Sequence, residues 1–279
     1  MSLFITSLNS GSNGNCYYIG NDTEAVLIDA GISCRETERR MKKLGLAISL
    51  VKAIFVSHEH IDHITGVPAL SKKYQIPVYI TSATLVNSKI PVQAHLVNSF
   101  QAGKPITIGK LSVKAFIKSH DAVDPHSFTI SYNQLKVGVF TDIGHSCKEV
   151  KKHFEQCHAV FLEANYCEDM LEKGSYPVYL KRRISGDKGH LSNNQALDLF
   201  IKHRGSHLSH LLLSHLSKNN NSPTLVSELF NKQAGNTRII VASRYEETPV
   251  FCIDGNQPVL KTKTSKNTIL TARQLTLFQ

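Results

Sequence analysis

The chain has 279 residues, of which 41% are apolar, so it can bury a large core. Its formal net charge of +10 favours a polyanionic partner such as nucleic acid, although many basic proteins bind none. It has neither an apolar run of about 18 residues nor a basic, apolar leader, so we expect a cytoplasmic protein without a membrane span. Six cysteines without a Cys-x-x-Cys pair predict free thiols with no zinc role.

The N-terminal segment predicts two strands joined by a polar loop. The strands are expected at residues 2–8 and 16–19, and Ser, Gly and Asn make up the loop at residues 9–15. That composition favours a tight turn, which is our expectation. The loop's backbone N–H groups and side chains could also line a phosphate, with Ser12 and Asn13 as the contacts.

The densest group of chemically active side chains follows the apolar run at residues 51–56, which predicts a buried strand. Three imidazoles and a carboxylate within six positions do not suit a packed core, because each buried ring nitrogen needs a partner. His58 and His60 lie two residues apart in extended chain, so both rings can reach one ion. Asp62 and His63 lie where a helix begins and can reach a second ion. The spacing predicts two metal ions, and a surface histidine cluster is the alternative.

Further predicted strands end beside a histidine or an aspartate. These residues are Asp29, His120, Asp142 and His215, after strands expected at 24–28, at 111–117, at 135–140 and before 215. A loop-capping role is the alternative for His120. His207 and His210 fall at or before the start of the last of these strands, so we expect both to be structural.

The remaining segments predict helices and strands that carry no candidate ligand. Helices are expected at 34–46, 68–74, 147–156, 168–173, 194–203 and 224–233, and strands at 77–81, 127–131, 159–162, 238–242 and 249–253. We expect the basic helix at 34–46 to be a solvated flank, and residues 82–110 to form strands and turns at a sheet edge. Residues 260–279 are basic and predict a loosely held tail.

Two segments near residue 190 allow both a structural and a functional interpretation. Three adjacent cations at 181–183, including Arg182, follow an aromatic pair and could contact a phosphate backbone or form a solvated helix face. His190 comes shortly before Ser192 and Asn193, which are good N-caps for the next helix. A histidine at that place is often only a neighbour of the cap.

The run His-x-His-x-Asp-His at a strand end resembles the central motif of the metallo-β-lactamase superfamily. The other motifs of the chain are similar to those of its YycJ/WalJ-like branch, and they lie at residues 10–16, 119–121, 141–144, 163–165, 189–193 and 213–217. The resemblance implies an α/β fold, the four-layer αββα sandwich. Because only 72 residues separate Asp142 from His215, an inserted second nuclease domain does not fit, and we expect one domain over residues 1–279.

The resemblance also implies a complete set of ligands for two divalent ions. The first ion would be held by His58, His60 and His120, and the second by Asp62, His63 and His215. Asp142 would bridge the two ions, and Asp29 would support the ligand loop without binding metal. Imidazole and carboxylate ligands suit zinc or manganese, and iron as well.

Members of this branch are described as metal-dependent DNA exonucleases that act 5′ to 3′. The resemblance therefore implies a dinuclear phosphodiesterase with DNA as its partner, in which a metal-bound hydroxide attacks phosphorus. It implies that Asp62 also orients the nucleophile and that His190 protonates the leaving oxygen. Weaker candidates for substrate contacts are Ser12, Asn13, Asn165, Arg182, Ser192, Asn193 and Ser217.

Other activities of the superfamily remain as alternatives. A β-lactamase would usually have Cys in place of Asp142, which argues against that activity. A thioester hydrolase of the glyoxalase II type, or another small-molecule metallohydrolase, would share all seven ligands. A transfer-RNA 3′-end nuclease would carry a long Gly/Pro-rich arm, which is not found here. A binding module without activity would have no need of the full ligand set.

Overall fold

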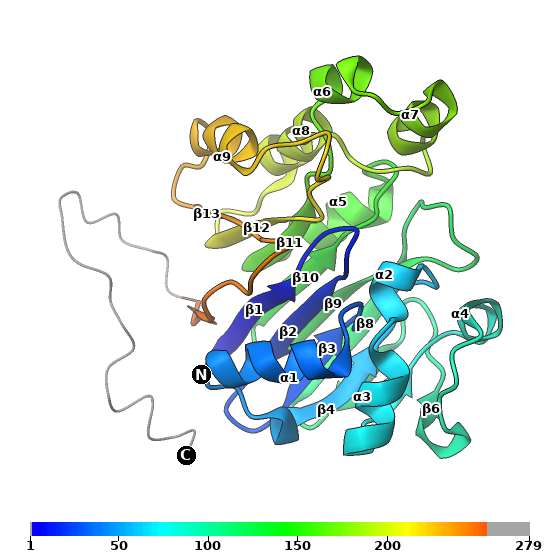
Figure 1. Ribbon diagram of the computed structural model, residues 1–279. Helices are drawn as coiled ribbons and strands as arrows, with labels where there is room; N and C mark the ends of the chain where they lie inside the picture. Colours follow the sequence, from blue (N-terminus) through cyan, green and yellow to red (C-terminus); the bar gives the residue numbers. More distant parts are fainter. Residues whose placement is uncertain (1, 256–279) are drawn as a thin grey trace.

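The computed structural model of the protein describes residues 2–255, and within them two seven-stranded sheets lie face to face (Figure 1). The first sheet has the order β14 (Phe251–Ile253), β1 (Leu3–Asn9), β2 (Cys16–Gly20), β3 (Ala25–Ile28), β4 (Val51–Phe55), β5 (Val78–Tyr79) and β6 (Val97–Asn98). The second has the order β13 (Arg238–Val241), β12 (His210–Ser214), β11 (Ala159–Glu163), β10 (Leu135–Phe140), β9 (His126–Tyr132), β8 (Leu111–Ile117) and β7 (Pro105–Ile108).

The direction of the strands brings several strand ends to one edge of each sheet. In the first sheet, β3 and β4 are parallel neighbours. In the second sheet, β10, β11 and β12 are parallel, and β8 runs the same way as β10 because both are antiparallel to β9. Parallel strands deliver their carboxyl ends to the same edge, where binding sites of α/β sheets usually lie.

Apolar side chains from both sheets interlock between them. The strands there are buried along nearly their whole length, and aromatic pairs connect the two sheets. Tyr17 of β2 lies 4.9 Å from Phe161 of β11 between ring centroids, and Phe55 of β4 lies 5.7 Å from Phe128 of β9. Burial at about 25 cal/mol per Å² makes this interior the main source of stability.

Helices cover the outer face of each sheet, which confirms the predicted four-layer sandwich (Figure 1). Met41 and Leu70 pack onto the first sheet, and Phe154, Phe200 and Phe230 pack onto the second. The helices are α1 (Cys34–Lys43), α2 (Ile61–Ile64), α3 (Val67–Tyr74), α4 (Ser82–Ser88), α5 (Lys148–Phe154), α6 (Glu168–Lys173), α7 (Val178–Ser185), α8 (Asn193–His203) and α9 (Pro223–Asn231).

Two local expectations were wrong. The segment at 82–110 begins with helix α4, because Thr81 caps it by accepting a hydrogen bond from the Thr84 backbone N–H (3.3 Å). The edge strands β6 and β7 follow as predicted. Helix α1 is not simply a solvated flank, since Met41 is buried and Arg40 donates from its buried guanidinium to the Leu8 carbonyl (2.6 Å). The hydropathy of arginine predicts an exposed side chain and does not reveal that this one reaches a buried backbone carbonyl.

Three further expectations concern the chain as a whole. The six cysteines are free thiols. Among the described residues, no helix has the length and apolar character needed to cross a bilayer. The tail expected at residues 260–279 lies outside the described residues.

Candidate metal centre

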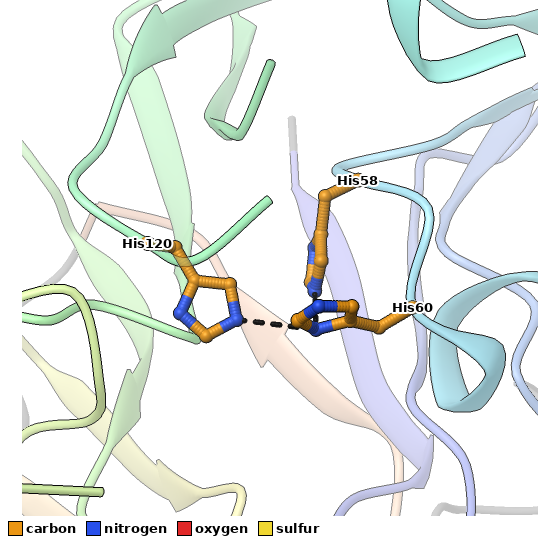
Figure 2. Close-up of side chains that lie close together, drawn as sticks. All are labelled: His58, His60 and His120. Atoms are coloured by element: carbon orange, nitrogen blue, oxygen red, sulfur yellow. Dashed lines mark hydrogen bonds between the residues drawn. The ribbon is translucent and has the colours of Figure 1, made fainter. Parts of the chain in front are cut away.

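The first predicted ligand group converges where β4 and β8 end, as Figure 2 shows for His58, His60 and His120. His60 Nδ1 lies 3.1 Å from His58 Nε2 and 3.3 Å from His120 Nε2. Nitrogens about 2.0–2.1 Å from a tetrahedral zinc ion would lie about 3.3 Å apart. The three nitrogens therefore have the spacing of ligands to a single ion.

The second predicted group lies beside the first. Asp62 Oδ2 is 3.6 Å from His63 Nε2 and 3.4 Å from His215 Nε2. Asp62 and His63 come from α2, and His215 follows β12, so the two sheets both contribute. These atoms could hold a second cation.

Asp142 lies between the two groups, and its carboxylate comes near members of both. Its Oδ2 is 3.1 Å from His63 Nε2, and its Oδ1 is 3.4 Å from His215 Nδ1 and 3.9 Å from His120 Nε2. Oδ2 is buried and accepts no hydrogen bond from residues 2–255. A buried carboxylate oxygen without a well-aligned donor is unfavourable, so the position fits an oxygen that ligates a cation.

Most of the ligand imidazoles have their second nitrogen held by an acceptor. His63 Nδ1–H donates to Asp29 Oδ2 (2.7 Å), and His58 Nδ1–H donates to Ser57 Oγ (2.8 Å), which itself donates to Asp29. His120 Nδ1–H donates to the Gly189 carbonyl (3.0 Å). Such bonds fix the tautomer that leaves Nε2 available to a metal.

Burial keeps two rings of the first group neutral. Loss of solvation lowers the pKa of His58 well below its ordinary value and lowers the pKa of His120 to about 4. A neutral imidazole is the form that binds a metal ion. These two rings are therefore ready to bind an ion without releasing a proton.

The second group is surrounded by carboxylates. Burial opposes protonation of His63, but Asp142, Asp29 and Asp62 outweigh it and raise the His63 pKa to about 10. The pKa of His215 is raised well above its ordinary value, because Asp142 and hydrogen bonds to carboxylates outweigh burial. Protons balance the negative charge here in the absence of an ion, and a divalent cation could do the same.

Three residues of the site have left-handed backbone. Asp29, Asp142 and His215 each follow a strand, with φ of 60°, 54° and 56°. This conformation is uncommon for residues other than glycine and costs of order 1–3 kcal/mol each. Such strain clusters at functional sites, where the surrounding packing holds it.

Comparison with known proteins agrees with this geometry. A sequence profile of the β-lactamase superfamily domain matches residues 24–215. The chain belongs to the metallo-β-lactamase superfamily. It is therefore a metal-dependent hydrolase.

Relatives named in the YycJ/WalJ branch match most of the chain, which confirms the resemblance drawn from the motifs. "Exodeoxyribonuclease YycJ" of Bacillus anthracis is 36% identical over 230 residues, 81% of this chain and 86% of that protein. "Exodeoxyribonuclease WalJ" of Streptococcus pneumoniae is 32% identical over 238 residues, 82% and 88% of the two chains. The metallo-β-lactamase fold protein YhfI from Bacillus subtilis superposes with a TM-score of 0.70 at 16% identity, over 90% of this chain and all of that one, and so shares the fold.

Glu163 is a central residue of this site to which the sequence analysis gave no role, although it begins the motif at residues 163–165. It ends β11 and is fully buried. Its Oε1 accepts hydrogen bonds from His190 Nδ1 (2.7 Å) and His215 Nδ1 (3.0 Å). Burial would raise its pKa, but His190 and the hydrogen bonds lower it to about 2. Its place at a strand end beside Asp142 and His215 was the available signal.

Asn15 was also missed, although it belongs to the loop predicted at 9–15. Its Nδ2 lies 3.1 Å from both Asp62 Oδ2 and His63 Nε2, and its backbone N–H donates to the Asp62 carbonyl (2.7 Å). Gly31 lies against the same carbonyl, where a Cβ would come within 1.7 Å of the oxygen. The loop therefore supports the second ligand group, and Gly11 to Gly14 form the predicted turn, closed by an N–H···O bond of 2.9 Å.

Three of the weaker candidates for substrate contact are engaged inside the fold. Asn165 Nδ2 donates to the His215 carbonyl (2.8 Å), so it positions a candidate ligand. Ser192 caps α8 and donates to Glu168 Oε1 (2.5 Å). Asn193 exchanges hydrogen bonds with Asn221. Their polar groups are already used.

The other weak candidates lie nearer the surface. Ser12 and Asn13 are exposed in the turn, and Asn13 Nδ2 donates to the Arg244 carbonyl (2.8 Å). Arg182 is exposed on α7, a helix without a buried residue. Ser217 is half-buried two residues after His215. These four remain predicted contacts.

Proposed function

We propose that the protein is a metal-dependent DNA exonuclease that holds two divalent cations and digests from the 5′ end. The observation that carries the proposal is the convergence of seven donor side chains at one edge of the sandwich. The names of the relatives at 36% and 32% identity support a DNA substrate. The direction follows from the resemblance of the motifs to that branch.

In this proposal, each donor group would hold one cation. The first would be held by His58, His60 and His120, the second by Asp62, His63 and His215, and Asp142 would serve both. Zinc and manganese suit these donors, as does iron. When bound, such ions make water a nucleophile near neutral pH and offset charge on the phosphate.

His190 is the proposed proton donor. Its ring lies between those of His120 and His215, with centroids 5.3 and 5.2 Å away, and its side chain is 21% exposed. Because Nδ1–H is bonded to Glu163, Nε2–H is the group available to the substrate. As the bond from phosphorus to the leaving sugar oxygen breaks, that oxygen takes the Nε2 proton, and solvent restores it.

Asp62 has a second proposed role, which is to orient the attacking water. Its Oδ2 accepts from Asn15 Nδ2, and the side chain is 17% exposed, so it faces the open side of the site. Substrate contacts are proposed for Ser12, Asn13, Arg182 and Ser217. The net charge of +10 favours this polyanionic substrate.

To test the proposal, DNA labelled at its 5′ or its 3′ end is incubated with the purified protein before and after metal removal, and release of the label is measured. We expect release of nucleotides from the 5′ end, restored by zinc or manganese and abolished in Asp142→Asn. A thioester and bis-p-nitrophenyl phosphate serve as comparison substrates. Turnover of the thioester without cleavage of DNA would contradict the proposal, as would full activity of Asp142→Asn.

A further inference from the structure

A hollow of about 270 Å³ adjoins the metal centre. Leu216 on its wall directly follows the candidate ligand His215. Ser10, also on the wall, accepts a hydrogen bond from the His215 backbone N–H at 2.8 Å. The wall of the hollow is thus joined directly to the backbone that carries His215.

The described residues that line the hollow include two cations, Lys218 and Arg244, and no carboxylate. Nη1 of Arg244 is buried and has no hydrogen-bond partner within residues 2–255. A buried guanidinium N–H without a partner is unfavourable, and an anion would satisfy it. The charge of the hollow therefore fits a phosphate.

Apolar and aromatic side chains form another part of the wall, beside the polar residues Ser10, Ser217, Asn221 and Ser243. Leu216 and Val241 line it, and so does Tyr245, which is 70% exposed. An exposed aromatic ring offers a stacking surface that accepts any base. A site with cations on one part and an apolar wall on another matches a nucleotide better than a free phosphate ion.

The polar loop at residues 10–15 holds Arg244 in place. Asn13 Nδ2 donates to the Arg244 carbonyl, and Ser10 N–H donates to the Ser243 carbonyl (3.1 Å). Gly11 has φ of 139°, and a Cβ there would lie 3.3 Å from Arg244 Cβ. The loop thus packs against the Arg244 backbone, which gives its Ser-Gly-Asn composition a role beyond the turn.

We propose that this hollow binds a nucleotide of the DNA strand next to the hydrolysed bond. Arg244 and Lys218 bind its phosphate, and Leu216, Val241 and Tyr245 contact its sugar and base. The inference rests on the proposed nuclease function and adds the subsite that receives the neighbouring nucleotide.

Binding is measured first, with the metal-free protein and a fluorescent single-stranded oligonucleotide, by anisotropy at several salt concentrations. We expect Arg244→Gln to weaken binding about tenfold and to make the slope of log K against log salt shallower by about 0.7, the value for one lost phosphate contact. Arg244→Lys keeps the positive charge but lacks the paired N–H donors of the guanidinium, so its affinity should lie between those of the wild type and Arg244→Gln. Arg238→Gln, at the opposite end of β13, makes the same charge change away from the hollow and should bind like the wild type.

Activity gives the second measurement. With the metal-loaded enzyme, we expect Arg244→Gln to lower kcat/KM for the oligonucleotide about tenfold more than for bis-p-nitrophenyl phosphate, which has no neighbouring nucleotide. Should Arg244→Gln fail to fold, Lys218→Gln changes an exposed residue of the same hollow and is expected to weaken binding several-fold.

Two outcomes would overturn the inference. One is binding by Arg244→Gln and Lys218→Gln within twofold of the wild type, with an unchanged salt slope. The other is an equal loss in Arg238→Gln, which would indicate only a general effect of charge. Failure of the wild type to cleave DNA would contradict the proposed function instead, and the binding measurement would still decide on the hollow.

Discussion

Replacing Glu163 by Gln should disable the second ligand group without changing the shape of the side chain. Besides the two histidines on Oε1, the carboxylate accepts hydrogen bonds at Oε2 from the backbone N–H groups of Ile143 (2.8 Å) and Leu191 (3.1 Å). All four partners are donors. An amide has one oxygen and one NH₂ group, so in either orientation its NH₂ faces two donors.

The cost can be estimated for both orientations. Hydrogen bonds to a charged group contribute about 1.5–3 kcal/mol each, so losing two should lower the free energy of unfolding by about 3–6 kcal/mol. If the NH₂ faces the rings, His215 can accept only with its proton moved to Nε2, the nitrogen near Asp62. Loss of such a supporting partner typically weakens metal binding about 10–100-fold.

Calorimetric titration of zinc or manganese into metal-free Glu163→Gln measures the affinity, and urea unfolding measures the stability. Glu172→Gln removes the same charge from an exposed position of α6 and should match the wild type in both. Metal binding by Glu163→Gln with wild-type affinity, together with a free energy of unfolding within about 1 kcal/mol of the wild type, would refute this role of Glu163.

Three further predictions test other parts of the structure. Metal at 100 times its Kd should stabilise the protein by about 2.7 kcal/mol for each ion bound, seen as a fall in Tm when a chelator is added. His190→Ala should slow DNA hydrolysis about 10²–10⁴-fold but slow a substrate with an acidic phenol leaving group far less, and equal losses would refute the proton-donor role. Burial lowers the pKa of His153 to about 4, so its neutral ring, stacked on Phe116, stabilises the fold above pH 6.5, and this contribution is lost as the pH falls toward 4. Between pH 7 and pH 4, the free energy of unfolding of His153→Phe should fall by about 1–3 kcal/mol less than that of the wild type.

The sequence was sufficient for the strands that carry candidate ligands, because each is an apolar run that stops at a polar residue. A buried strand has this apolar run in its sequence whatever element it packs against. Helix α4 was missed because its start depends on the cap at Thr81, in a segment with few apolar residues. The buried contact from Arg40 to Leu8 joins distant parts of the chain, so no local pattern could predict it.

Within the site, spacing along the chain identifies only residues that lie close together and share a partner, and lone strand-end residues such as Asp142 and His215 received their roles from the family resemblance. His58 and His60 point to an ion by themselves, whereas Glu163 acquires its role only when β10, β11 and β12 bring Ile143, His190 and His215 to it. A lone acid after an apolar strand has no such spacing. Its partners come from three other places in the chain.

The left-handed backbone at Asp29, Asp142 and His215 explains why the centre depends on the sandwich around it. Glycine would relieve the strain at each position but would remove the side chain that the site uses. Aspartate and histidine tolerate this conformation better than most residues, yet three such positions still cost a few kcal/mol in total. That cost is met by the buried sheets on both sides, so substitutions in the core beneath these strand ends should loosen the centre before they unfold the protein.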